Sequence, residues 1–305
     1  MSRSLADWGR VYLTGFSMGV ADLVPGVSGG TVAFIAGIYD ELLGTIAGVR
    51  FSLLTELREE GVVATWRSAN LTFLVVLLAG VFTAVAALAG LLHRLLEEEP
   101  ERLWAFFFGL VAASVPLVGR EIKRWTAQRV VLATIGLAAA GLITSLPPLM
   151  QSDHPAFLFA CGAVAICAMI LPGISGSFLL LILGAYAAVI GALKSFDLVR
   201  IGVFGAGAVV GLLGFSRVLK RLLDERRAAT LSVLTGFLLG SLNALWPWKE
   251  AVRELYTHSD GRIEYFRVNA GVGDDVWALV ALAVAGAVLV LGLDRLGRMV
   301  KGQRA

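Results

Sequence analysis

A short motif that occurs twice constrains this chain more than any other feature. The pattern Pro-Gly-aliphatic-Ser-Gly stands at Pro25–Gly29 and again, 147 residues further along, at Pro172–Gly176. The match continues downstream at the same spacing, where two pairs correspond: Gly37 with Gly184, and Tyr39 with Tyr186. Because apolar sequence flanks both copies, the repeat indicates an internal duplication in a membrane protein.

The composition supports this class. Hydrophobic residues make up 57% of the 305 residues, charged residues only 16%, and the mean hydropathy is +0.80, whereas soluble domains average about 25% charged residues. Several apolar runs reach the roughly 20 residues that a membrane-spanning helix needs. They are continuous rather than alternating, which disfavours a transmembrane barrel. The sequence therefore predicts an all-α polytopic membrane protein.

The duplication divides the chain into a first repeat, residues 1–150, and a second repeat, residues 151–305. We expect each repeat to hold a re-entrant segment with a broken helix, followed by about three transmembrane helices. In this interpretation Thr31–Val49 and Ser177–Leu193 are single half-helices that lead out of the breaks, and Asp197–Val218 and Ala229–Trp246 are separate spans. The charged stretch Arg50–Asn70 predicts an amphipathic helix at the interface.

Counting crossings predicts how the two repeats are related. If each broken segment enters and leaves on one side, each repeat crosses the membrane an odd number of times, and the second repeat is inverted. This arrangement places 18 of the 26 Lys and Arg residues inside and 8 outside, in agreement with the positive-inside rule. It also places the N- and C-termini in the cytoplasm. The net charge of +3 then reflects cytoplasmic loops, and we expect no nucleic-acid partner.

The residue types at the breaks favour an anion. Non-helical backbone at membrane depth is tolerated only where it is buried in protein or lines a cavity, and broken helices in inverted repeats are where transporters bind substrate. Helix N-termini offer free amides and a positive dipole end, and glycine lets a ligand approach the backbone. The candidate substrate-binding residues are Ser28, Gly29, Gly30, Thr31, Ser175, Gly176, Ser177 and Arg217. The alternative is that the glycines only permit close helix packing, and that Arg217 extends to the interface.

A second set of residues is assigned to coupling or gating. Asp22 is the acidic residue nearest the first break, while Met169 holds the corresponding place in the second repeat. An ionisable group at this depth is a candidate proton carrier, but Asp22 could equally cap its own loop. The other members of the set are Pro25, Pro172, Tyr39, Tyr186 and Glu41. The two tyrosines alternatively belong to the aromatic belt, and Glu41 to the solvated interface.

The stretch Gly19–Thr31, together with Leu171–Phe178 and Gly240–Trp248, resembles a bacterial membrane family that was long a domain of unknown function and is now identified as polyprenyl-phosphate transporters of the PopT type. The resemblance covers nearly the whole chain. It implies a flippase that returns undecaprenyl phosphate to the cytoplasmic leaflet for recycling of the lipid carrier in cell-wall biogenesis. It also implies residence in the bacterial cytoplasmic (inner) membrane. The residues to which the resemblance assigns a role are those of the paired motifs: Asp22, Pro25, Ser28, Gly29, Gly30, Thr31, Pro172, Ser175, Gly176 and Ser177.

Other function classes fit less well. A small-anion transporter or channel stays open as the alternative, and a membrane lipid-phosphate enzyme is a weaker one, because the sequence lacks a nucleophile with a base or a set of metal ligands at membrane depth. We therefore expect no enzyme activity, no metal and no cofactor. The expected partners are a polyprenyl phosphate, membrane lipids and a coupling ion, either a proton or sodium. An oligomer is compatible with the sequence.

Overall fold

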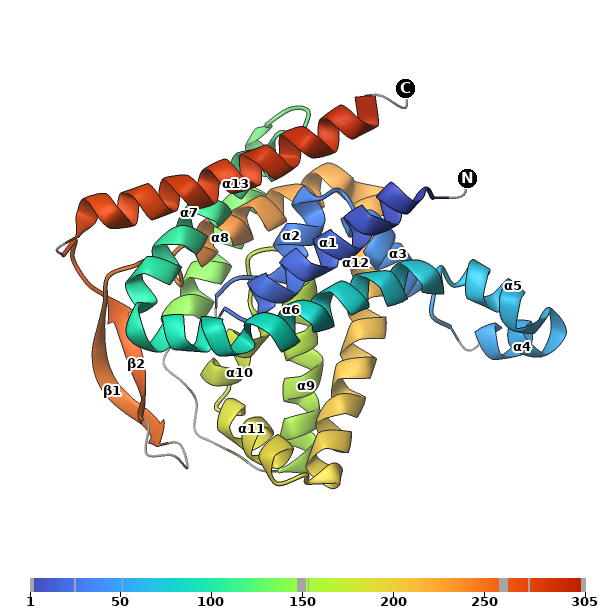
Figure 1. The fold of residues 1–305 in the computed structure, drawn as a ribbon, viewed down its shortest axis with the longest axis horizontal. Coiled ribbons are helices and arrows are strands. Elements are labelled where there is room, and N and C mark those ends of the chain that lie inside the picture. The colour runs from blue at the N-terminus through green and yellow to red at the C-terminus, as the bar shows by residue number, and fades with distance from the viewer. Residues whose placement is uncertain are drawn as a thin grey trace.

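The computed structural model describes residues 3–24, 26–50, 52–146, 152, 154–257, 263–273 and 275–302 (Figure 1). The helices are α1 (Leu5–Asp22), α2 (Gly29–Ile35), α3 (Tyr39–Ala47), α4 (Ser52–Glu59), α5 (Gly61–Ser68), α6 (Leu71–Glu98), α7 (Pro100–Gly119), α8 (Ala127–Ser145), α9 (Pro155–Ile170), α10 (Gly176–Ile182), α11 (Tyr186–Lys194), α12 (Leu198–Ser241) and α13 (Val276–Gly302). Two strands, β1 (Lys249–Thr257) and β2 (Ile263–Asn269), stand between α12 and α13.

Five of the described helices, namely α6, α7, α8, α12 and α13, are long and apolar enough to cross a membrane. The number rises to seven if each bent pair, α2 with α3 and α10 with α11, counts as one span. Large apolar side chains on these helices face outward, as Phe82 on α6 and Val209 on α12 do. The chain is a helical, multi-pass membrane protein, as its composition predicts.

Each half begins with one longer helix, α1 or α9, that is followed by two short helices. After the break, α2 and α3 meet at 118°, and α10 and α11 meet at 109°. The prediction of one half-helix over Thr31–Val49 and one over Ser177–Leu193 is therefore wrong. Each segment bends because Gly37 and Gly184 both have a φ of 73°, a backbone conformation that only glycine adopts without strain.

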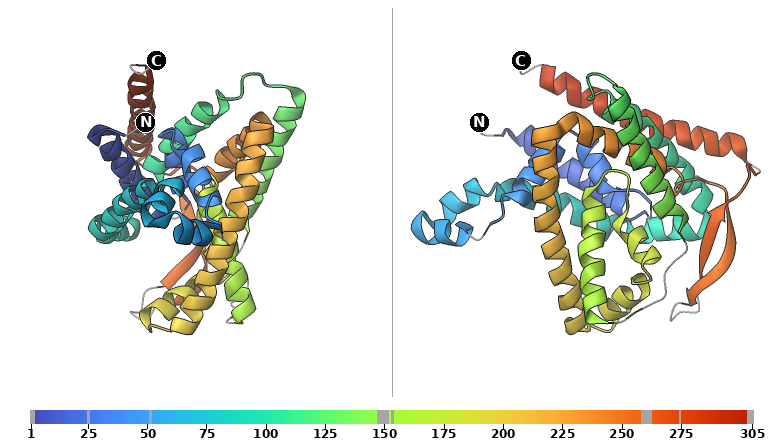
Figure 2. Two further views of the ribbon diagram at one scale, coloured as in Figure 1. Left: turned by 90° about the vertical axis from the view of Figure 1, so that its right-hand side faces the viewer. Right: turned by 180° about the vertical axis from the view of Figure 1, so that it is seen from behind.

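Equivalent glycines of the two halves make equivalent contacts between helices. An ideal Cβ atom on Gly15 of α1 would lie 2.0 Å from the carbonyl oxygen of Leu77 on α6, and one on Gly162 of α9 would lie 2.2 Å from that of Phe204 on α12. Small residues allow helices in membranes to approach this closely. The first half differs by an insertion: 23 residues separate α3 from α6, whereas three separate α11 from α12. The inserted α4 and α5 extend away from the other helices (Figures 1 and 2).

The helix α12 corrects a second expectation, because it runs through the basic stretch that the sequence suggests is a loop. It extends over 44 residues and is kinked at Arg226, which has φ −137° and ψ 44°. Ion pairs one helical turn apart, Lys220 with Asp224 and Arg221 with Glu225, favour the helical form. The predicted spans Asp197–Val218 and Ala229–Trp246 thus correspond to two arms of one kinked helix, which ends at Ser241.

The antiparallel hairpin of β1 and β2 is the one departure from an all-helical fold in the described residues. Lys249 pairs with Asn269 at its base, and the hairpin lies along one end of the molecule (Figure 2). The alternation that marks a strand is weak here. The sequence of this region is mixed and polar, a pattern that indicates a loop rather than strands.

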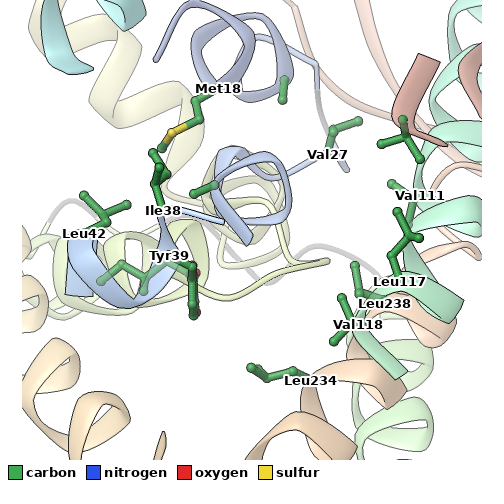
Figure 3. Packing of buried hydrophobic residues seen from close by; sticks show 14 of the residues in the cluster. Met18, Val27, Ile38, Tyr39, Leu42, Val111, Leu117, Val118, Leu234 and Leu238 are labelled. Carbon is green, nitrogen blue, oxygen red and sulfur yellow. The ribbon is translucent and has the colours of Figure 1, made fainter. Parts of the chain in front are cut away.

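The core forms around the first break. Val24, Val27 and Ala33 are fully or almost fully buried. Figure 3 shows residues of this core that come from both halves, including Met18, Tyr39, Val111 and Leu238. The break is therefore enclosed by protein on several sides, as non-helical backbone at membrane depth requires.

Candidate functional site

The two breaks lie against each other, and side chains of the first half bind the end of α9. The Ser28 hydroxyl donates to the carbonyl oxygens of Leu171 (2.9 Å) and Met169 (3.2 Å). The Tyr39 hydroxyl donates to the carbonyl oxygen of Ile170 (3.0 Å). The last carbonyls of a helix have no partner within it, so these hydroxyls satisfy acceptors that α9 leaves open.

A further hydrogen bond joins the two breaks, and in this one the donor belongs to the second half. The amide of Gly173 donates to the Thr31 hydroxyl over 3.0 Å, and Thr31 is completely buried. Gly30 packs so closely that a Cβ atom on it would lie 2.5 Å from the carbonyl oxygen of Ile170. The alternative in which the glycines permit close packing therefore holds for Gly30. The hydroxyls of Ser28, Thr31 and Tyr39 form hydrogen bonds that join the two halves.

The N-terminus of α2 is occupied by acceptors of the protein itself. The Asp22 carboxylate accepts from the Gly29 amide (2.7 Å), and the Ser28 hydroxyl accepts from the Gly30 amide (3.1 Å). A Cβ atom on Gly29 would lie 2.6 Å from the second carboxylate oxygen of Asp22. Asp22 thus holds the place at α2 that an anionic ligand would take.

The N-terminus of α10 differs, because Met169 stands where Asp22 stands in the first half and has no anionic group to offer. The Ser175 hydroxyl is hydrogen-bonded to that of Ser177 (2.9 Å). Among the described residues no acceptor contacts the amides of Gly176 and Ser177. The second break therefore leaves these amides without a protein acceptor among the described residues, while the Met169 side chain packs against Gly176.

A cavity of about 210 Å³ adjoins this helix end. Asp22, Ser175 and Ser177 supply the polar side chains of its wall, and the rest of the wall is apolar or glycine. The lining residues are Asp22, Gly162, Ala165, Ile166, Met169, Ser175, Gly176, Ser177, Leu180, Val189, Phe204 and Ala208. The cavity thus combines hydroxyls, amides and one carboxyl group with an apolar wall.

The structure places Arg217 apart from this cavity. Its side chain is exposed and donates to the carbonyl oxygens of Ala47 and Val49, just after α3. No hydrogen bond joins it to Asp22 or to the residues of the second break. Arg217 instead satisfies carbonyls at the end of α3.

The remaining predicted residues that the structure describes are not part of the cavity wall. Glu41 forms an ion pair with Arg3 and is not part of the cavity wall. Tyr186 packs against a small cluster beside α10, and Pro172 is buried after α9. Pro25 lies outside the described residues. The roles in coupling or gating stay predictions.

One charged network was not predicted from the sequence. Arg227, next to the kink of α12, binds Asp40 at the start of α3 (3.0 Å) and Glu121 just after α7 (3.0 Å). The three residues are far apart in the chain, and nothing in their sequence context links them. The network fixes the kinked helix of the second half against two elements of the first half.

Among the described residues no group of three or more His, Cys, Asp or Glu side chains is placed to hold a metal ion. The three described carboxylates nearest the breaks, Asp22, Asp40 and Glu41, each bind separate partners. The chemistry of the site is therefore that of hydrogen-bond donors and a carboxyl group.

Comparison with known proteins identifies the family. Residues 18–263 match the model of a family described as VCA0040-like, undecaprenyl phosphate translocase-like. A polyprenyl-phosphate transporter of Vibrio cholerae is 43% identical over 97% of this chain and 99% of its own length. A polyprenyl-phosphate transporter of Staphylococcus aureus is 30% identical over 77% of this chain and 85% of its own length. No solved structure matches. The chain therefore belongs to the undecaprenyl phosphate translocase-like family.

Proposed function

We propose that this protein is a secondary transporter that moves undecaprenyl phosphate across the bacterial cytoplasmic membrane and so recycles the lipid carrier. The names of the relatives support the substrate class. The apolar wall of the cavity, with Ile166, Leu180 and Phe204, fits a lipid better than a small hydrated anion. The proposal does not include an enzymatic step.

The phosphate head binds, in this proposal, at the open end of α10. The amides of Gly176 and Ser177 and the hydroxyls of Ser175 and Ser177 border the cavity. Oriented amides and hydroxyls are the groups that proteins use to hold phosphate. Ser28, Gly29, Gly30 and Thr31 contribute indirectly, because they hold the first break against the second.

Asp22 couples transport to an ion in this proposal. Its carboxyl group borders the same cavity and binds the Gly29 amide. A phosphate entering beside an ionised Asp22 would meet a like charge, whereas a protonated or cation-bound Asp22 would tolerate it. Substrate binding and cation binding would then favour each other.

The inverted arrangement of the repeats belongs to the same proposal. Equivalent contacts in the two halves, such as those of Gly15 and Gly162, support a shared ancestry of the units. The positive-inside count supports cytoplasmic termini. Breaks that open toward opposite leaflets would let the head group pass between them while the prenyl chain stays in lipid.

The open end of α10 is the observation that carries the proposal, and transport in proteoliposomes tests it. We expect the double variant Ser175→Ala, Ser177→Ala to move a labelled polyprenyl phosphate at least tenfold more slowly, since hydrogen bonds to charged groups contribute about 1.5–3 kcal/mol each. Ser195→Ala, at the exposed end of α11, is the matched control and should keep the rate of the unmodified protein. An unchanged rate in the double variant would remove α10 as the head-group site.

A further inference from the structure

Two cations share one aromatic ring at the base of the hairpin. The Lys249 ammonium of β1 lies 5.1 Å from the ring centroid of Trp104 on α7, and the Arg267 guanidinium of β2 lies 5.5 Å from the same centroid. Three separate elements, two strands and one helix, thus converge on a single cluster, which we call the Trp104 cluster (Lys249, Arg267 and Trp104).

The positive charge of this cluster has no acidic partner among the residues that the structure describes. No carboxylate among the described residues forms an ion pair with Lys249 or Arg267. Burial, and then the charge of Arg267, lower the pKa of Lys249 from 10.5 to about 8. Like charges held together in a partly buried place disfavour each other, and a bound anion would relieve that repulsion.

The Trp104 cluster lies directly beyond the first break. The Lys249 ammonium donates to the carbonyl oxygen of Ala244 over 2.8 Å. The same oxygen is 3.8 Å from the position of a Cβ atom on Gly26, which stands in the break with a φ of 93°. A single residue, Ala244, therefore separates the cationic cluster from the broken segment.

Several aromatic residues lie close in the chain to the residues of the Trp104 cluster. The Trp246 ring lies 6.0 Å from that of Phe108 and 5.3 Å from that of Trp248, and its indole donates to the carbonyl oxygen of Ala270. Tryptophans gather where a protein crosses the boundary between lipid and water. The cluster is thus placed where the head group of a membrane lipid lies.

We propose that Lys249 and Arg267 bind a phosphate monoester at this boundary, as a loading site distinct from the cavity at α10. A phosphate monoester carries about −1.5 to −2 charges, which matches two cations, while a carboxylate or a phosphodiester carries one. A guanidinium binds phosphate oxygens in pairs and an ammonium adds a point charge. The inference rests on the proposed function, since polyprenyl phosphate is the monoester lipid in question, although phosphatidic acid and free phosphate share its chemistry.

Photocrosslinking tests this site in the full-length protein in nanodiscs. The probe is a polyprenyl phosphate with a photoreactive group beside the phosphate, and mass spectrometry locates the labelled peptides. We expect labelling of the hairpin, and at least tenfold less of it in the double variant Lys249→Gln, Arg267→Gln. The control Arg253→Gln removes a charge from the exposed face of the same hairpin and should label normally.

Two further arms make the result decisive. Lys249→Arg with Arg267→Lys keeps both charges and should restore labelling, which separates loss of charge from loss of fold. Ser175→Ala, Ser177→Ala should still label at the hairpin, so a failure of the α10 site is distinguishable from a failure of this one. Competition with phosphatidic acid and with inorganic phosphate identifies the natural source of the phosphate. Undiminished labelling in the glutamine variant, or equal competition by a phosphate-free polyprenol, would overturn the proposal.

Discussion

At the scale of single residues, one difference between the halves decides the character of the site. Asp22 closes the N-terminus of α2 by accepting from the Gly29 amide, whereas Met169, whose side chain packs against Gly176, offers no acceptor to the corresponding amides of α10. The duplicated motif predicts that both breaks matter, and the asymmetry at this position is visible in the sequence. The bonds of Ser28 to the end of α9 span more than 140 residues. They could not be predicted, because no local pattern specifies which carbonyls two loops bring together.

Thr31→Val should destabilise the protein. The substitution keeps the shape of the side chain and removes the acceptor of the buried Gly173 amide, and an unsatisfied buried amide costs about 1–3 kcal/mol. We expect a lower free energy of unfolding in a denaturant titration in mixed micelles. Thr31→Ser retains the hydroxyl and serves as the control, with a smaller loss. Equal stability of Thr31→Val and the unmodified protein would show that the bond does not hold the breaks together.

The Trp104 cluster should bind phosphate less well in alkali. As the pH rises through about 8, Lys249 loses its proton, while the guanidinium of Arg267, the other charged group facing it, stays charged. Binding of the lipid phosphate to nanodiscs of the Ser175→Ala, Ser177→Ala variant should therefore weaken between pH 7 and 10. A bound anion stabilises the protonated ammonium of Lys249, so the midpoint of this pH dependence is higher when the phosphate is bound. Lys249→Arg should abolish the dependence, and a flat profile in the protein that retains Lys249 would contradict the assignment.

At the scale of elements, the apolar spans were predictable and their bends and joins were not. The spans α6, α7, α8 and α13 follow from long apolar runs. The bends at Gly37 and Gly184 depend on a positive φ, which a glycine permits but does not demand. The helix α12 carries, next to its kink, the ion pairs of Arg227 with Asp40 and Glu121, and the hairpin depends on pairing between two weakly alternating segments. Each of these features arises from contacts that local sequence does not encode.

Helix contacts mediated by glycine should be intolerant of one added methyl group. A Cβ atom on Gly109 of α7 would lie 1.8 Å from the carbonyl oxygen of Ala283 on α13, while one on Gly141 of α8 would meet nothing within 4 Å. We expect Gly109→Ala to lower the apparent melting temperature in detergent by several degrees. Gly141→Ala should leave it unchanged or raise it, because alanine favours a helix over glycine by about 1 kcal/mol. Similar melting of both variants would contradict this packing.

At the scale of the whole molecule, the two halves are interlocked rather than side by side. A helix of one half packs on a helix of the other, α7 on α13 and α8 on α12, and in each pair a glycine lies against a backbone carbonyl, Gly109 at Ala283 and Gly236 at Ala133. The breaks are tied together by the hydroxyls of Ser28, Thr31 and Tyr39. Movement of one half relative to the other must therefore change the contacts at the breaks, which is where the cavity lies.

The most direct test of the central claim is a cryo-electron microscopy structure of the full-length protein in nanodiscs that contain a polyprenyl phosphate. We predict density for the phosphate in the cavity, within hydrogen-bonding distance of the Gly176 and Ser177 amides, with the prenyl chain leaving along the apolar wall toward the lipid. A lipid whose head group lies elsewhere on the protein, with the cavity filled by packed side chains, would contradict the account.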